Sequence, residues 1–179
     1  DDAGHGSMVA GILGAVGNNG RGVCGVAWTV QIMAGKCLDS SGSGTVSELV
    51  ACMDYARTNG AQVINASLVV DEFSQTLSNA VWLTREAGIV LVAAAGNSAR
   101  DMDATPAYPA AFDFDNIVSV GFTTRKDVRG ALSNFGATTV DLMAPGDAIC
   151  STFWISDNSY LCNAFQKRSS YAAPYVAGA

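Results

Sequence analysis

Four short, largely hydrophobic runs constrain the fold of this chain more than any other feature of its sequence. They lie at residues 30–34, 63–68, 89–94 and 117–120. Their residues do not alternate between hydrophobic and polar, so both faces of each run are expected to be buried, as in a strand inside a parallel sheet. The sequence therefore predicts a sheet that is covered on both sides.

Two helical patterns separate these predicted strands. Hydrophobic residues recur with helical spacing over residues 46–56, and the pattern stops at residues 59–60, Asn-Gly. A second helical pattern covers residues 77–87 and stops at Gly88. Both stops are typical of helix C-termini. Because strands that alternate with helices indicate right-handed crossovers, we expect an α/β fold, a three-layer α/β/α sandwich around a mainly parallel sheet.

Composition supports a compact fold and narrows the classes of partner. Hydrophobic residues make up 49% of the 179 residues and charged residues 15%, which excludes a disordered chain and fits one domain. The net charge of −6, without a run of lysine or arginine, argues against nucleic acid and anionic membranes. No hydrophobic stretch approaches the ~18 residues that span a bilayer. We therefore expect the chain to bind neither nucleic acid nor a membrane.

The chain has five cysteines, and no pair of them has the C-x-x-C spacing of zinc and redox sites. We expect Cys24, Cys37 and Cys52 to be small buried hydrophobic residues. Cys150 and Cys162 enclose a short polar loop, and they either form a disulfide in an oxidising compartment or remain free thiols.

Three polar residues stand where an α/β fold places function, at the carboxyl ends of strands and the starts of helices. His5 is the only histidine, and it lies between two glycines at the start of an apparent helix of small residues. Ser170 opens a second small-residue helix. The two suggest a nucleophile and its base side by side, although serine is also a common helix cap. Asn97 follows the run 89–94 and is either a turn residue or an oxyanion donor.

Four motifs make the catalytic interpretation specific. Residues 5–11, HGSMVAG, resemble the H-G-T-H-V-A-G motif of the subtilisin-like serine peptidases, and residues 169–178, SSYAAPYVAG, resemble their T-S-M-A-A-P-H-V-A-G motif. Residues 92–97 look like the segment with the family's oxyanion asparagine, and residues 63–68 look like its substrate-pairing strand. With a similar segment at 140–146, the resemblance covers nearly the whole chain.

The resemblance implies a serine endopeptidase that hydrolyses peptide bonds by acyl transfer. It implies that Ser170 is the nucleophile, that His5 is the general base, and that the Asn97 side chain and the Ser170 N–H stabilise the oxyanion. The residues implied to line the substrate cleft and its specificity pocket are Ser67, Leu68, Val69, Ala94, Ala95 and Gly96. It also implies a secreted, monomeric protein that acts on peptides or proteins and requires no cofactor.

Structural calcium is a further possibility that the resemblance raises for the full-length domain. Residues 17–23 are similar to a loop that binds calcium in some family members, but the upstream acidic ligand would be absent here. We therefore favour an ordinary loop over a metal site as the interpretation of residues 17–23.

The chain departs from the family pattern at both ends. The triad acid is expected on a strand upstream of His5, and Asp1 and Asp2 are too close to His5 in sequence to be that residue. We therefore expect residues 1–179 to be a partial subtilisin-like domain, incomplete at both termini and inactive by itself. Two alternatives remain. One is a degenerate homologue that binds peptide without cleaving it, and the other is a nucleotide-binding protein, which only the glycine turn at 41–44 suggests.

Departures inside the motifs lead to local expectations. Arg168 stands where the family has glycine, and a positive φ there would strain an arginine. Val69 replaces a glycine and is expected to narrow the cleft. Met8 and Tyr175 each replace a histidine, and we expect their side chains to touch. The Tyr108–Pro109 bond resembles a cis bond of the family, so we expect it to be cis.

Overall fold

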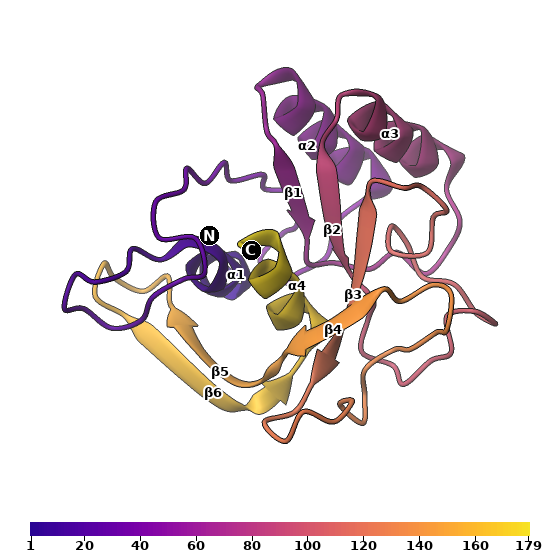
Figure 1. Cartoon of the computed structure of the whole chain (residues 1–179). Helices are drawn as coiled ribbons and strands as arrows, with labels where there is room; N and C mark the ends of the chain where they lie inside the picture. Colours follow the sequence, from indigo (N-terminus) through magenta and orange to yellow (C-terminus); the bar gives the residue numbers. More distant parts are fainter.

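A four-stranded parallel sheet forms the middle layer of the fold (Figure 1). The computed structural model describes the backbone of residues 1–179 and every side chain except those of residues 163–166. The strands lie in chain order: β1 (Val63–Ala66), β2 (Val90–Ala94), β3 (Ile117–Thr123) and β4 (Leu142–Pro145). The first three confirm three of the four predicted strands.

Helices cover both faces of this sheet (Figure 1). On one face, α2 (Val46–Thr58) packs against α3 (Gln75–Glu86). On the other face, α4 (Ser169–Ala177) contacts all four strands, and α1 (His5–Gly14) packs against α4. This arrangement confirms the predicted three-layer α/β/α sandwich.

A two-stranded antiparallel hairpin stands beside the sandwich and contacts α1 through its first strand. Its strands are β5 (Asp147–Thr152) and β6 (Tyr160–Lys167). Cys150 and Cys162 lie opposite each other in the hairpin and form a disulfide, with Cα atoms 3.9 Å apart. The sequence allowed either a disulfide or two free thiols for this pair, and the structure has the disulfide.

Local sequence explains where α2 and α3 begin and end. Thr45 accepts a hydrogen bond from the backbone of Glu48, whose carboxylate bonds back to Thr45, and the two form a capping box. Ser74 caps α3 in the simpler way, by accepting from the backbone N–H of Leu77. Both helices stop where predicted, before Gly60 (φ 79°) and Gly88 (φ 71°), whose left-handed backbone only glycine adopts without strain.

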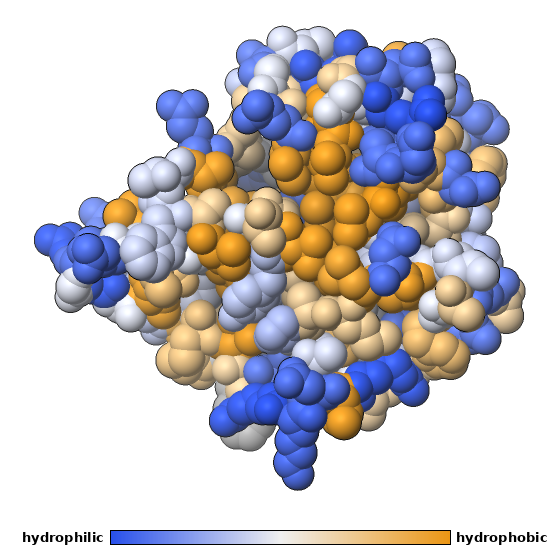
Figure 2. Space-filling model, in the orientation of Figure 1, coloured by the Kyte–Doolittle hydropathy of each residue, from blue (hydrophilic) through white to orange (hydrophobic). Residues whose placement is uncertain are grey.

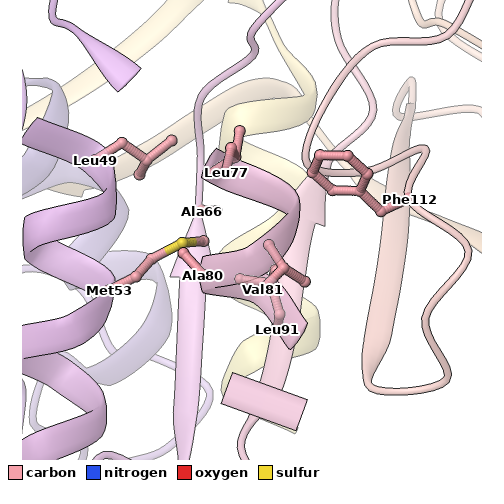
Figure 3. Packing of buried hydrophobic residues seen from close by; sticks show 8 residues of the cluster. All are labelled: Leu49, Met53, Ala66, Leu77, Ala80, Val81, Leu91 and Phe112. Carbon is pink, nitrogen blue, oxygen red and sulfur yellow. The ribbon is translucent and has the colours of Figure 1, made fainter. Parts of the chain in front are cut away.

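Adjacent residues of β2 point into two different cores. Leu91 belongs to the core between the sheet and the α2–α3 pair (Figure 3). Val92 belongs to the core under α4, which it shares with Ala172 and Ala173. Because side chains alternate along a strand, a β2 that is hydrophobic throughout is buried on both faces, as its sequence predicted.

The predicted strand at residues 30–34 is wrong. This segment is an exposed coil, in which Val30, Ile32 and Met33 are 44%, 48% and 44% exposed. A strand needs a neighbour that completes its hydrogen-bond ladder, and no described strand pairs with this segment. The hydrophobic pattern indicated a tendency to be buried, but it could not indicate whether a partner lies beside the segment.

Hydrophobic side chains gather at the centre of the face that carries α4, between hydrophilic margins (Figure 2). Exposed hydrophobic residues also occur at the starts of two strands, where Val63 of β1 and Val90 of β2 are 43% and 41% exposed. Among the described residues, no helix is both long and apolar enough to cross a membrane.

Candidate active site

The first turn of α4 lies at the carboxyl edge of β1 and β2. Ser67, directly after β1, donates a hydrogen bond of 2.8 Å to the carbonyl oxygen of Ser170. Asn97, just after β2, accepts one of 2.7 Å from the backbone N–H of Ser169. Two loops that follow neighbouring parallel strands thus hold one helix end at the edge where α/β folds place function. The free N–H groups and the positive end of the helix dipole are presented at this edge.

The bond from Ser67 replaces one that α4 cannot make for itself. In an α-helix the carbonyl of Ser170 would accept from the N–H of residue 174, but Pro174 has no N–H. The Ser67 hydroxyl supplies the missing donor, and it accepts a 2.9 Å bond from the amide of Asn65. The backbone of Ser170 is therefore fixed from β1.

The two adjacent serines at the start of α4 have different surroundings. The hydroxyl of Ser169 accepts a 3.0 Å bond from the N–H of Gly96, so it is part of the framework. The Ser170 hydroxyl is buried and has no hydrogen-bond partner among the described residues. Buried polar groups are rarely left without a partner, and those that are often have a catalytic role. Ser170 is therefore the serine that is free to react.

Arg168 precedes this turn without backbone strain. Its φ of −145° and ψ of 139° are those of an ordinary extended residue, and its N–H donates to the carbonyl of Gly146 at 3.0 Å. The strain expected for an arginine here is therefore wrong, because the position does not use the left-handed backbone that would favour glycine.

The hydrogen bond between Asn97 and Ser169 also fixes the direction of the Asn97 amide. A backbone N–H can only donate, so the atom facing Ser169 is the side-chain oxygen. The amide nitrogen has no hydrogen-bond partner among the described residues and retains both of its donors. The side chain can therefore bind a developing negative charge beside Ser170.

His5 reaches the same region from the start of α1. Its ring centre lies 5.8 Å from that of Tyr171, the residue after Ser170. Burial, and to a lesser extent the positive charge of Arg168, lower the pKa of His5 from its ordinary 6.5. The imidazole is therefore neutral at neutral pH and can accept a proton. In this structure it makes no hydrogen bond to the Ser170 hydroxyl.

No carboxylate forms a hydrogen bond or ion pair with His5 among the described residues. Asp1 instead holds the start of α1, where its carboxylate accepts from the backbone N–H groups of Gly4 and Ser7 at 3.0 and 2.7 Å. Asp2 pairs with Lys36 at 3.2 Å. Both acids belong to the segment that leads into α1, as expected.

Met8 and the tyrosines of α4 fill the space between α1 and α4. The Tyr171 hydroxyl donates to the sulfur of Met8 at 3.7 Å, and Tyr175 packs against the same buried cluster. The sulfur of Met8 thus contacts Tyr171, whereas the predicted contact was with Tyr175, which packs against the same cluster. Tyr171 joins α1 to the turn that carries Ser170.

Of the predicted substrate-binding residues, Val69 and Gly96 meet across the site. Val69 is 37% exposed, and its Cγ2 would lie 3.5 Å from a Cβ added to Gly96. Gly96 has a φ of 111°, and an added Cβ would come within 2.4 Å of the Asn134 amide, so only glycine fits. The Val69 side chain therefore lies against the segment that contains Gly96.

Of the four remaining predicted lining residues, Ser67 bonds to the Ser170 carbonyl, and the other three turn into the protein. Ala94 and Ala95 are 2% and 0% exposed. The N–H of Ala95 donates to the carbonyl of Val120, and the carbonyl of Ala95 accepts from the Asn134 amide. Leu68 packs against the core of α2 and α3. These side chains support the walls of the site from behind. Beside them, the Tyr108–Pro109 bond is cis, as expected.

Two weaker motifs prove to be surface features. The glycine turn at 41–44 is closed by Asp39, whose carboxylate accepts from the N–H groups of Ser41 and Ser43 at 2.8 and 3.0 Å. Its amides are therefore not available to a phosphate, which removes the motif that suggested nucleotide binding. Residues 17–23 form a loop at the surface.

The fold and the order of these motifs match one known family. A family model described as the subtilase family, peptidase S8, matches residues 1–179. The chain belongs to the subtilase family. This subtilase is 41% identical over 174 residues to a thermophilic serine proteinase of Bacillus sp. (strain AK1), with 97% of the chain and 41% of the relative covered. It is 41% identical over 180 residues to subtilisin DY of Bacillus licheniformis, with 100% and 62% covered.

A solved structure shares the subtilase fold at a similar level. It is a cold adapted subtilisin-like serine proteinase, with a TM-score of 0.84 and 37% identity over 99% of this chain and 60% of that one. The chain spans 41% and 62% of the length of the two sequence relatives.

Three polar residues of the subtilase site were not predicted to act there. Ser169 and Asn65 adjoin predicted motif residues, so a search for side chains that could bond the helix start would have found them. Asn134 holds Ala95 and the loop after β2 through three hydrogen bonds of 2.8 to 3.1 Å. It is distant in sequence from every motif, and no local signal marks it.

Proposed function

We propose that this subtilase is a serine endopeptidase that cleaves peptide bonds by acyl transfer to Ser170. The observation that carries the proposal is the buried, unpartnered Ser170 hydroxyl beside an Asn97 amide whose donors are free. The identity to serine proteinases and the position of His5 support the same chemistry.

In the proposed first step, Ser170 Oγ attacks the carbonyl carbon of the scissile bond while its proton passes to neutral His5. The carbonyl electron pair moves to the oxygen, and this oxyanion accepts hydrogen bonds from the Asn97 amide nitrogen and the Ser170 N–H. The Ser170 N–H is available because N–H groups in the first turn of a helix have no intrahelical acceptor.

In the proposed second step, His5 returns its proton to the leaving amine nitrogen as the C–N bond breaks, which leaves an ester on Ser170. Water then hydrolyses the ester with His5 again as base. Each step passes through an imidazolium, which a carboxylate beside the ring would stabilise. We therefore propose that residues 1–179 alone react slowly, because loss of the acid from such a triad lowers turnover by about 10⁴.

One observation favours the alternative, a degenerate homologue that binds peptide without cleaving it. Arg168 places a positive charge near His5 and so opposes the imidazolium that both steps require. Val69 would restrict which peptides enter. This alternative keeps the same cleft and the same class of ligand, a peptide.

We also propose that the protein acts outside the cell. The Cys150–Cys162 disulfide supports an oxidising compartment. Peptides and proteins are the proposed substrates, and a monomer is the proposed state.

Cleavage of a chromogenic peptide library tests the proposal. The assay compares residues 1–179 with the longest natural polypeptide that contains them, each as wild type, Ser170→Ala and Ser169→Ala. We expect turnover by the longer form that Ser170→Ala abolishes and Ser169→Ala only lowers. Peptide binding without turnover in both forms would support the degenerate homologue. Equal turnover by both forms would show that His5 needs no acid beyond residues 1–179.

A further inference from the structure

Cys37 and Cys52 lie together on the side of the molecule formed by α2. Cys37 belongs to the coil that precedes α2, and Cys52 lies in the middle of that helix. Both are free and half-buried, and Cys37 packs against the core cluster that contains Leu49 and Met53, the α2 residues before and after Cys52. The coil also passes close to Cys52 at Gly35, where an added Cβ would lie 3.4 Å from the Cys52 sulfur. The coil therefore runs directly over Cys52.

The surroundings of the pair differ from those of an ordinary core cysteine. Cys37 packs only at the margin of the core that includes Leu49 and Met53, so solvent and small reagents have access to it. Burial and the nearby Cys52 raise the pKa of the Cys37 thiol. Cys24, the third free cysteine, is exposed, so the expectation that it is buried is wrong.

We propose that Cys37 and Cys52 are an oxidisable dithiol that closes to a second disulfide and fastens the coil at 30–44 to α2. An S–S bond is about 2.05 Å long, so the coil must move to bring the Cys37 sulfur against the Cys52 sulfur. The coil can supply that movement, because residues 30–36 are exposed and form neither helix nor strand. The proposal does not depend on the peptidase activity.

The reaction uses a low-molecular-weight disulfide such as oxidised glutathione as the oxidant. One cysteine thiolate attacks a glutathione sulfur, which forms a mixed disulfide and releases one glutathione thiolate. The second cysteine then attacks the protein sulfur of that mixed disulfide and releases the second glutathione. Two cysteine thiols are oxidised by two electrons, one glutathione disulfide is reduced to two thiols, and the protons pass to solvent or to the released thiolates.

Tryptic mapping tests the proposal because the sequence separates the cysteines into three peptides. Residues 37–57 contain both members of the pair, residues 22–36 contain Cys24, and residues 130–167 contain the established disulfide. The protein is incubated with oxidised glutathione or with dithiothreitol, alkylated with iodoacetamide, digested and weighed. We expect peptide 37–57 to lose two hydrogens, about 2 Da, and both alkylation sites together after oxidation. Peptide 22–36 is expected to stay alkylated or to carry one glutathione.

Variants make the result decisive. In Cys37→Ser and Cys52→Ser the remaining thiol is expected to be alkylated or glutathionylated, whereas Cys24→Ser leaves the internal disulfide unchanged. Trypsin cleavage of the native protein after Lys36, whose side chain is 61% exposed, is expected to be slower in the oxidised form. That protection should be absent in Cys52→Ser. Two alkylated cysteines in peptide 37–57 after oxidation, or two separate glutathione adducts, would overturn the proposal.

Discussion

The side-chain oxygen of Asn97 accepts a 2.7 Å hydrogen bond from the backbone N–H of Ser169, the residue before the proposed nucleophile Ser170. One bond therefore does two things. It ties the loop after β2 to the start of α4, and it turns the amide nitrogen of Asn97 away from Ser169 with both donors free. The side-chain oxygen of Asn97 thus holds the start of α4 in place, and the amide nitrogen of the same side chain is the proposed donor to the oxyanion.

Replacement of Asn97 by aspartate separates these two roles. A carboxylate still accepts from the Ser169 N–H but cannot donate to an oxyanion. We expect Asn97→Asp to lower kcat by about 10²–10³ or more with little change in the thermal midpoint. Asn97→Ala is expected to lose both activity and stability. Wild-type turnover in Asn97→Asp would show that the amide nitrogen does not take part.

Burial and the charge of Arg168 together shift the pH at which His5 becomes a base. Burial and Arg168 lower the pKa of His5, so the acid limb of the kcat/KM profile is expected below pH 6.5. Arg168→Gly removes the charge and should move that limb to higher pH. Arg21→Gly, the same change in a distant loop, should leave it in place. An acid limb that does not respond to Arg168→Gly would mean that another group titrates.

The Ser67 hydroxyl and Pro174 form a pair that a double-mutant cycle can test. Ser67→Ala leaves the Ser170 carbonyl without a donor and is expected to cost about 1–3 kcal/mol of unfolding free energy. Pro174→Ala supplies a helical N–H to that carbonyl, so the double variant should regain part of the loss. Ser98→Ala, on the facing loop, serves as the control. Strictly additive effects would show that Pro174 is not the reason for the Ser67 bond.

The sequence predicted those helices and strands that are determined by residues close together in the chain. α2 and α3 have their own caps, hydrophobic faces and terminal glycines within a few residues, so their bounds could be predicted closely. The strands β1, β2 and β3 could be predicted from their largely hydrophobic runs. The segment at 30–34 has the same pattern but no described neighbour, and pairing is a property that no local pattern contains.

The candidate site was predicted as a set of residues rather than as a geometry. The motifs predicted roles for His5, Asn97 and Ser170 because the proposed chemistry requires those residue types. They could not show that Arg168 is extended, since φ depends on the bonds made by the finished fold. The Tyr171 contact with Met8 and the use of Ser67 in place of a proline N–H also arise only when α1, β1 and α4 meet.

Reaction with a fluorophosphonate tests the central claim, that Ser170 is an activated nucleophile, most directly. Trypsin cuts after Arg168, so residues 169–179 carry both serines on one peptide, and fragmentation can assign the adduct to either. For the longest natural polypeptide that contains this chain, we predict one phosphonyl adduct on Ser170. It should be absent in Ser170→Ala, strongly slowed in His5→Ala and still present in Ser169→Ala. No adduct on a folded protein, or an adduct on Ser169, would contradict the account.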